Sequence, residues 1–513
     1  MPKTVHVILA LLAMGQAGVV THNHAGTMQA PQNVVHGALV QLTANGAWSW
    51  YQDERAIIDM AEGKLIVGSV ANRNGSGGKA VDGNVQTTHY DLATGEKQTF
   101  VHNKLKSYGS GDDHNAPALL KKDDGNILVF YAAHNNLKGT EDDRSYYRTF
   151  NVTDETWTDE QVYRWWKHIP QDTPGKGGVT YSNLIQLSAE DPDGDGHGRI
   201  YNFARVKQSP QITYSDDNGK SWIYGGQLTM QSSNPPSSNY VNGYYKYSTN
   251  GVNRIDIVAT EFHPRDANTS IYHAYLKEGK LYNTAGNVID DDVFDCSQSF
   301  EENRITSTDD FTPVFKAGNH SNSRNWNIDI HSYQDGSISI LFKSRAGGFG
   351  DHRHGADDHR LWLARLEPGA INWRVNEVAR LGGQLFRGKE TDYTGLAALV
   401  PNDKNVIYIA TEIDPRADLK LQRHEIFRGE KARYSDAWHW TPITENSTVD
   451  NLRPIVPTWD AKNTALLWWR GNMRNSQRYN TEVVGILEQN DSTDAALDDQ
   501  AVPATTLENI AKK

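Results

Sequence analysis

Residues 123–131 read DDGNILVFY, a turn rich in Asp and Gly that leads directly into an apolar run. The same combination recurs, at spacings of roughly 50 to 85 residues, as EGKLIVGSV (62–70), GHGRIYNFA (196–204), NGVNRIDIVA (250–259), QDGSISILF (334–342), NDKNVIYIA (402–410) and DAKNTALLWW (460–469). A turn followed by a short apolar run is typical of a strand that is entered through a hairpin. Each interval has room for about three more strands, so one repeat has the length of a propeller blade.

Seven repeats predict an all-β fold, a seven-bladed β-propeller that occupies residues 30–488 as a single domain. One repeat cannot bury both faces of its sheet alone, so neighbouring blades have to stack. The composition agrees, because 14 Trp, 23 Tyr, 13 Phe and 43 Gly among 513 residues favour short strands and turns over long helices. A β-sandwich with recurrent hairpin turns is the alternative, but a sandwich rarely spreads its strands over residues 62–469.

Residues 215–222 (SDDNGKSW) resemble the Asp-box hairpin of sialidase-like propeller repeats. In such a hairpin the Asp caps the turn, the Gly takes a positive φ and the Trp packs beneath. This resemblance supports the fold and says little about activity.

The two ends of the chain differ from the rest. Lys3, the apolar residues 5–14 and the small residues around Ala17 predict a secretory signal peptide over residues 1–22, with a buried N-terminal strand as the alternative. We therefore expect a secreted protein, extracellular or periplasmic. No other stretch approaches the ~20 apolar residues of a membrane span, so no membrane contact is expected. Residues 489–513 are polar and acidic, which predicts a loosely docked tail.

The net charge of −12 argues against nucleic acid as a partner. It leaves a polyanionic sugar open, provided that basic groups gather locally in one groove. We expect a monomer that acts on such a polymer without an organic cofactor.

Two histidines fall at the ends of neighbouring predicted strands. His114 lies in GDDHNAP (111–117), just before one strand, and His134 lies at the end of the next. Their separation matches a strand, a hairpin turn and a returning strand, so both imidazoles can meet at one end of a blade. Two unrelated loop histidines are the alternative.

Further polar residues fall at strand ends in the next repeats. Tyr181 opens one predicted strand, Arg205 closes its partner, and Tyr244 and Lys246 open another. Each tyrosine alone is most simply a packing residue of the core or rim. Together these residues place polar groups at one end of successive blades, as a site at the mouth of a propeller requires.

The segments that carry these residues resemble, in sequence and in order along the chain, the propeller-type ulvan lyases and their BNR-like relatives, secreted enzymes that degrade a sulfated green-algal polysaccharide. The resemblance runs from about Trp48 to Gly471, and it includes WSWYQDERAI (48–57), DDHNAPAL (112–119), TYSNLIQL (180–187), YYKYSTNGVNRIDIVATEFHPRD (244–266) and YTGLAALVPNDKNVIYIATE (393–412). The spacing of His114 and His134 adds to its specificity.

The resemblance implies cleavage of ulvan by β-elimination at the C4–O bond of a uronic acid, which gives an unsaturated uronyl product. Arg205, assisted by His134, would neutralise the uronate carboxylate, because a charge-assisted contact stabilises the enolate-like intermediate. We prefer His114 as the base at C5 and Tyr181 as the acid at O4. The reverse assignment and a tyrosine-only version stay open. The candidate substrate-binding residues are Tyr244, Lys246 and Arg324.

A metal site is predicted around Cys296, the single cysteine of the chain. His263, Asp266 and His273 precede it and complete a ligand set suited to tetrahedral zinc. The resemblance also implies a structural metal near this strand pair. Four protein ligands leave no open position, so such a zinc would be structural. A buried free thiol beside hydrogen-bonded histidines is the alternative.

Two other functions stay open. A sialidase-like glycoside hydrolase needs a tyrosine paired with a carboxylate, and hydrolases typically use two carboxylates; no such pairing follows from the spacing. A non-catalytic carbohydrate-binding propeller would keep the aromatic and Arg residues, but it would not need two histidines at matched strand ends.

Overall fold

The computed structural model describes residues 32–489, except 51, 53–54, 135–143, 174–177, 231, 233–242, 299–305, 319–323, 347–354 and 387–391. The predicted signal peptide (1–22) and residues 490–513 of the predicted tail lie outside the described residues. No helix within the described part of the chain is long and apolar enough to cross a membrane.

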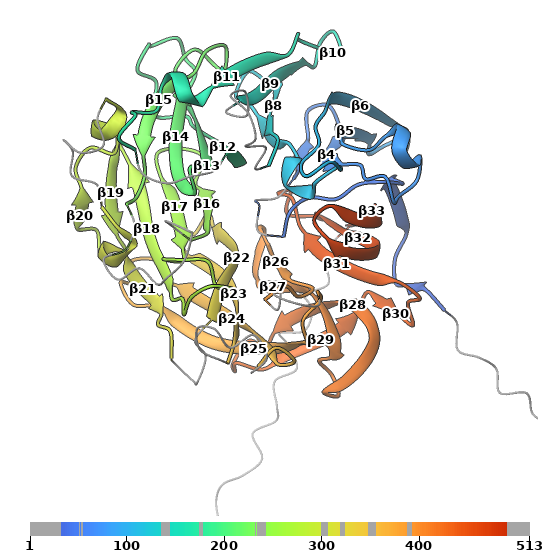
Figure 1. Ribbon diagram of the computed structural model, residues 1–513. Helices are drawn as coiled ribbons and strands as arrows, with labels where there is room; N and C mark the ends of the chain where they lie inside the picture. The colour runs from blue at the N-terminus through green and yellow to red at the C-terminus, as the bar shows by residue number, and fades with distance from the viewer. Residues whose placement is uncertain are drawn as a thin grey trace, which may run out of the picture. The chain divides into compact units, whose positions relative to one another are not determined.

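Seven antiparallel sheets of four or more strands follow one another in a ring (Figure 1). The prediction of an all-β, seven-bladed propeller is therefore confirmed. The first three blades are β3 (Ala56–Asp59), β4 (Lys64–Val70), β5 (Asn84–Asp91) and β6 (Lys97–Lys104); β7 (Ala118–Lys121), β8 (Ile127–Ala132), β9 (Arg144–Asn151), β10 (Thr156–Trp157) and β11 (Gln161–Arg164); and β12 (Val179–Leu187), β13 (Arg199–Val206), β14 (Ser209–Ser215) and β15 (Ile223–Gln227).

The later blades follow the same order. They are β16 (Tyr245–Thr249), β17 (Ile255–Ala259), β18 (Ile271–Lys277), β19 (Lys280–Asn283), β20 (Val288–Asp290) and β21 (Thr312–Phe315); β22 (Arg324–Ser332), β23 (Ile338–Arg345), β24 (His359–Leu366) and β25 (Arg374–Gly382); β26 (Ala397–Val400), β27 (Asp403–Asp414), β28 (Leu419–Lys431) and β29 (Trp438–Pro442); and β31 (Asp450–Ile455), β32 (Asn463–Asn475) and β33 (Arg478–Gln489) with β2 (Leu39–Thr43). The short strands β1 (Val34–Val35) and β30 (Thr444–Glu445) pair separately. The single-turn helices are η1 (Gly78–Ala80), η2 (Asp113–Asn115), η3 (Trp165–Lys167), η4 (Asp295–Ser297) and η5 (Thr308–Asp310).

Each of the seven sequence repeats contains the second strand of a blade. These strands are β4, β8, β13, β17, β23, β27 and β32. Every residue of β8 and of β17 is buried, because both faces of a blade are covered by its neighbours. Burial on both faces explains the apolar runs of the repeats, which alternate less than strands with one face in water.

The Asp-box hairpin has the predicted form. The Asp217 carboxylate accepts a hydrogen bond from the Ser221 amide at 2.8 Å, and Gly219 has φ +85°. Trp222 is buried against Phe130 of the preceding blade, with ring centroids 5.0 Å apart. The hairpin thus joins the second and third blades.

The ring closes by joining the two ends of the described chain. β2 pairs with β33 in the last blade, with Leu39 opposite Ile486, and Ala47 then bridges to Val70 in the first blade. Trp469 of β32 lies edge-on to Trp48 at 5.6 Å and to Trp50 at 4.8 Å. These indoles are fully buried, so apolar packing holds the closure together.

The innermost strands of the blades lie against one another, β7 beside β12 and β16 beside β22. The segments that precede them therefore meet at one end of the ring. The Arg55 guanidinium, just before β3, links the first blade to β12 of the third by donating to the Ser182 carbonyl at 2.8 Å. This end of the propeller holds the candidate site.

We expect Trp469→Ala to lower the free energy of unfolding by about 3–5 kcal/mol, because it removes a buried indole from the closure. Chemical denaturation followed by fluorescence measures the change. Tyr434→Ala is the control; Tyr434 is 88% exposed, so its loss should change stability by about 0.5 kcal/mol or less. A loss below about 1 kcal/mol for Trp469→Ala would contradict the role given to this cluster.

Candidate functional site

His114 is held by the carboxylates that precede it. It lies in η2, where the Asp112 side chain caps the helix by accepting from the His114 amide. The His114 Nδ1 lies 2.8 Å from Asp112 Oδ1 and 2.5 Å from Asp113 Oδ1. The backbone turn and the ring orientation thus depend on the same carboxylate.

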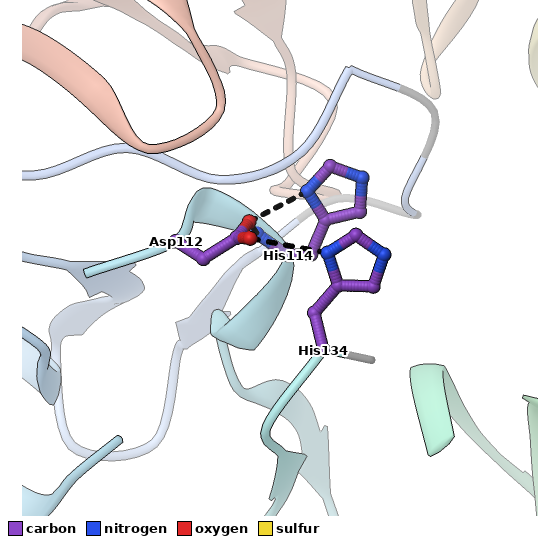
Figure 2. A group of neighbouring side chains, drawn as sticks. All are labelled: Asp112, His114 and His134. Carbon is purple, nitrogen blue, oxygen red and sulfur yellow. Dashed lines mark hydrogen bonds and ion pairs between the residues drawn. The ribbon is translucent and has the colours of Figure 1, made fainter. Parts of the chain in front are cut away.

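His134 follows β8 and shares that carboxylate. Its Nδ1 lies 3.1 Å from Asp112 Oδ2, and its amide donates to Asn115 Oδ1 at 2.7 Å. The His114 and His134 rings are stacked, with centroids 4.0 Å apart and planes 7° apart. Figure 2 shows both rings with Nδ1 toward Asp112 and the other nitrogen pointing away from it. The spacing argument placed these two imidazoles correctly at one end of a blade.

The two imidazoles differ in charge. Burial opposes charge on His114, yet Tyr181, Asp112 and Asp113 together raise its pKa well above the usual 6.5. Burial and the neighbouring His114 lower the pKa of His134 to about 4. At neutral pH the stack therefore consists of an imidazolium and a neutral imidazole.

The two carboxylates differ as well. Burial would raise the pKa of Asp112, but His134 and His114 hold it well below its usual range. Burial raises the pKa of Asp113 to about 6, and the adjacent Asp112 adds to the effect. Because ionised Asp112 only accepts hydrogen bonds, the proton of neutral His134 lies on Nδ1 and its Nε2 is an acceptor.

Tyr181 comes from the next blade and has a strained backbone. Its φ is +59°, at a β-bulge between Thr180 and Asn183 in the pairing of β12 with β13. Asn183 Nδ2 donates to the Tyr181 carbonyl at 2.8 Å and holds the bulge. Such a conformation costs about 1–3 kcal/mol in a non-glycine residue, and bulges of this kind re-aim side chains at functional sites.

Tyr181 lies between the two cations of the site. Its ring centroid is 5.3 Å from that of His114, and the Arg205 guanidinium lies over its face at 4.3 Å. Tyr244 follows at 6.0 Å from Tyr181, with Arg205 5.6 Å from its ring. Tyr181, Arg205 and Tyr244 line one pocket. All five predicted residues His114, His134, Tyr181, Arg205 and Tyr244 are therefore neighbours.

Lys246 and Arg324 do not join these five residues. Lys246 alternates with Tyr245 along β16 and is buried, with its Nζ donating to the Ile328 carbonyl of the next blade at 2.8 Å. Arg324 is also buried, 3.5 Å from Asp392. The prediction that these two side chains contact substrate is wrong in this arrangement, because both cations link blades.

The predicted zinc ligands are not gathered into one set. His273 on β18 contacts Thr284 at 2.9 Å and Asp256 at 3.2 Å, whereas Cys296 in η4 accepts from the Gln227 amide at 2.9 Å.

The other two ligands have partners of their own. His263 lies against Tyr244 and Trp326, and Asp266 pairs with Arg265. Among the described residues, one group of three or more potential ligands has all its ligand atoms within 4.8 Å, namely Asp112, His114 and His134. The predicted quartet does not fit a zinc ion, because nearness in sequence did not reveal which way each side chain faces.

Several residues of the site were missed from sequence. Asp112 and Asp113 stand in the quoted GDDHNAP, and acidic residues beside a histidine were the available signal. Gln477 donates to Asp112 from the last blade, a contact that no local pattern indicates. Tyr108, which is 68% exposed, lies edge-on to His134 at 6.1 Å.

A family model described as BNR repeat-containing family member matches residues 70–372. No curated protein matches the chain. Among solved structures, the chain is similar to a structure of a new family of polysaccharide lyase, PL25-Ulvanlyase, with a TM-score of 0.57 and 12% identity over 87% of this chain and 95% of that one.

Two further structures are similar over most of their length. The same lyase bound to -[GlcA(1-4)Rha3S]- has a TM-score of 0.57 and 12% identity, covering 88% and 95% of the two chains. The polysaccharide lyase Uly1 has a TM-score of 0.50 and 12% identity, covering 88% and 99%. At these identities the likeness concerns the fold alone.

We expect Asp112→Asn to lower the pKa of His114, because it removes a negative charge that stabilises the imidazolium. Titration of the His114 ring followed by NMR measures the change. Asp123→Asn, which removes a carboxylate 2.9 Å from His197, is the matched control and should leave the His114 titration unchanged.

An unaltered His114 titration in Asp112→Asn would contradict the electrostatic role of Asp112. The same coupling has a sign for stability. The pKa of His114 is higher in the folded protein than in the unfolded chain, so protonation of His114 stabilises the fold. This stabilisation is fully present below the unfolded pKa near 6.5 and is lost as the pH rises through the folded pKa.

Proposed function

The chain belongs to the BNR repeat-containing family, and from this premise we propose that it is a secreted polysaccharide lyase that cleaves ulvan by β-elimination. The observation that carries the proposal is that the Tyr181 ring lies between two cations, His114 and Arg205, at the end of the propeller that holds the candidate site. The fold shared with ulvan lyases supports it. A secreted location, which residues 1–22 predict, suits an enzyme whose substrate is an extracellular polymer.

Arg205 is the group proposed to bind the uronate carboxylate. The C5 proton of a uronate becomes acidic only when the negative charge of the carboxylate is neutralised. A guanidinium can bind a carboxylate through two parallel hydrogen bonds and stabilise the enolate-like intermediate. Arg205 lies over Tyr181 and near Tyr244, so a carboxylate bound there has a phenol beside it.

The charges of the site favour Tyr181 as the base and His114 as the acid, the reverse of the assignment preferred from sequence. An imidazolium has no lone pair with which to take a proton, so His114 suits the acid, and Tyr181 between His114 and Arg205 is the remaining candidate for the base. In the proposed step the C5 proton passes to the Tyr181 oxygen and the C–H electrons form the C4–C5 double bond. The C4–O4 bond breaks, and His114 Nε2 protonates O4.

His134 has a different part in this scheme. With a pKa lowered to about 4 it is a weak base at neutral pH and carries no charge for a carboxylate. Its Nε2 accepts hydrogen bonds, so we assign it to a sugar hydroxyl and to packing against His114.

Hydrolysis is less well supported by the same residues. Most glycoside hydrolases use two carboxyl groups that flank the glycosidic bond, and sialidase-like ones pair a tyrosine with a carboxylate. Asp112 and Asp113 are buried and hydrogen-bonded to imidazoles. They are therefore placed to support His114 and not to reach a sugar.

The first test follows absorbance near 235 nm while the protein acts on ulvan, with chondroitin and alginate as controls. We expect rising absorbance on ulvan, and a fall of about 100-fold or more in Tyr181→Phe and His114→Ala. His197→Ala, an outer-surface change, should keep full activity. New reducing ends without absorbance would establish hydrolysis, and binding without either signal would establish a lectin-like propeller.

A second test separates the acid from the base. A 4-deoxy-4-fluoro uronoside loses fluoride, a leaving group that needs little protonation. We expect His114→Ala to recover at least about tenfold of its lost activity on this substrate, because only acid catalysis is bypassed. Tyr181→Phe should stay inactive. Recovery in Tyr181→Phe, with His114→Ala inactive, would show that His114 is the base.

A further inference from the structure

A second pocket lies beside the candidate site, between the last blade and the first. It is lined by Asn74, Asn472, Arg474, Arg478, Tyr479 and Asn480, and has a volume of about 430 Å³, within the range of ligand pockets. Figure 1 shows β32 and β33 beside β4 and β5, and the Tyr479 hydroxyl donates to the Val70 carbonyl at 3.0 Å. The pocket is thus formed where the ring closes.

Two cations share this pocket. Arg478 opens β33 opposite Asn475, and Arg474 is the additional residue at the β-bulge between Met473 and Asn475. Both side chains are exposed, and none of the described residues that line the pocket is acidic. Neither guanidinium has an ion-pair partner among the residues that the structure describes. Like charges at neighbouring positions of a hairpin repel each other, so an anion bound between them is stabilising.

The hairpin turn between β32 and β33 links the pocket to the candidate site by hydrogen bonds. The Ser476 carbonyl accepts from the Asp113 amide at 3.0 Å, and the Gln477 side chain donates to Asp112. The turn between Arg474 and Arg478 therefore contacts the Asp112 carboxylate and the Asp113 backbone amide, next to His114.

A second set of contacts leads to the other histidine. Arg73, the neighbour of Asn74, donates to the Gly109 carbonyl. The adjacent Tyr108 is exposed and lies edge-on to His134. These contacts connect the surroundings of His134 with Arg73, the residue next to Asn74 in the pocket.

We propose that Arg474 and Arg478, with Asn74, Asn472 and Asn480, form an accessory subsite for an oxyanion of the polysaccharide outside the cleaved linkage. The inference rests on the proposed function, since it assumes a polyanionic chain at the histidines. The amides of the asparagines suit the oxygens of a sulfate ester or of a carboxylate, and the guanidinium groups supply the charge. A contact remote from the reacting bond strengthens binding of substrate and transition state alike.

The test compares wild type with Arg474→Ala/Arg478→Ala on ulvan by absorbance at 235 nm. We expect KM to rise about tenfold with kcat within about twofold, because uniform binding is lost. The control is Lys277→Ala/Lys280→Ala, which removes two cations from the β18–β19 hairpin and should change neither constant. The difference between wild type and the arginine variant should shrink as salt is added.

Modified substrates identify the anion. If the subsite holds a sulfate ester, wild type and the arginine variant should have equal KM on desulfated ulvan; if it holds a carboxylate, they should be equal on partly carboxyl-reduced ulvan. Equal KM on native ulvan would overturn the subsite while leaving the lyase intact.

Affinity electrophoresis in gels that contain ulvan measures binding without catalysis. It therefore tests the subsite independently of the proposed lyase activity. Absence of a 235 nm signal from wild type would refute the lyase, yet weaker retardation of the arginine variant than of wild type would still support the subsite. Equal retardation of wild type, the arginine variant and the lysine control would overturn the subsite without reference to catalysis.

Discussion

A blade of four strands has two apolar faces, and in this chain only a neighbouring blade covers each of them. Every residue of β8 and β17 is buried for that reason. Open stacking would leave one apolar face exposed at each end, so the constraint is met only by closing the ring. The pairing of β2 with β33 and the packing of Trp48, Trp50 and Trp469 complete it. The other features of the molecule depend on this closure, because it brings segments distant in sequence to one end of the propeller.

The site is built on one buried negative charge. Asp112 receives hydrogen bonds from two imidazoles of the same blade, and the two rings differ in protonation although they are stacked. Burial opposes charge on both rings, and the carboxylates overcome it only at His114. The cation that results faces Tyr181, whose backbone is held in a strained conformation by a bulge. Charge and strain are therefore concentrated where two blades meet.

The sequence predicted the fold well because blade architecture is local. Each repeat contains its own turn and its own buried strand, so seven copies indicate seven blades. That His114, His134, Tyr181 and Arg205 lie close together could be predicted for the same reason, since hairpin lengths decide which strand ends meet. The burial of Lys246 and Arg324 and the separate partners of the predicted zinc ligands could not be predicted, because the face on which a side chain lies depends on register and bulges that spacing does not reveal. Gln477 was missed because its contact with Asp112 spans most of the chain.

The contact between Gln477 and Asp112 also bears on the order in which the candidate site is assembled during folding. The residues of the second and third blades carry the imidazoles and the phenol, but the turn that reaches Asp112 and Asp113 belongs to residues 476–477. A chain that lacks its last hairpin contains every group assigned to proton transfer, yet nothing from the last blade fixes the carboxylate between the imidazoles. The arrangement of the two imidazoles around Asp112 is therefore complete only when residues 476–477 of the last blade have docked against the second blade.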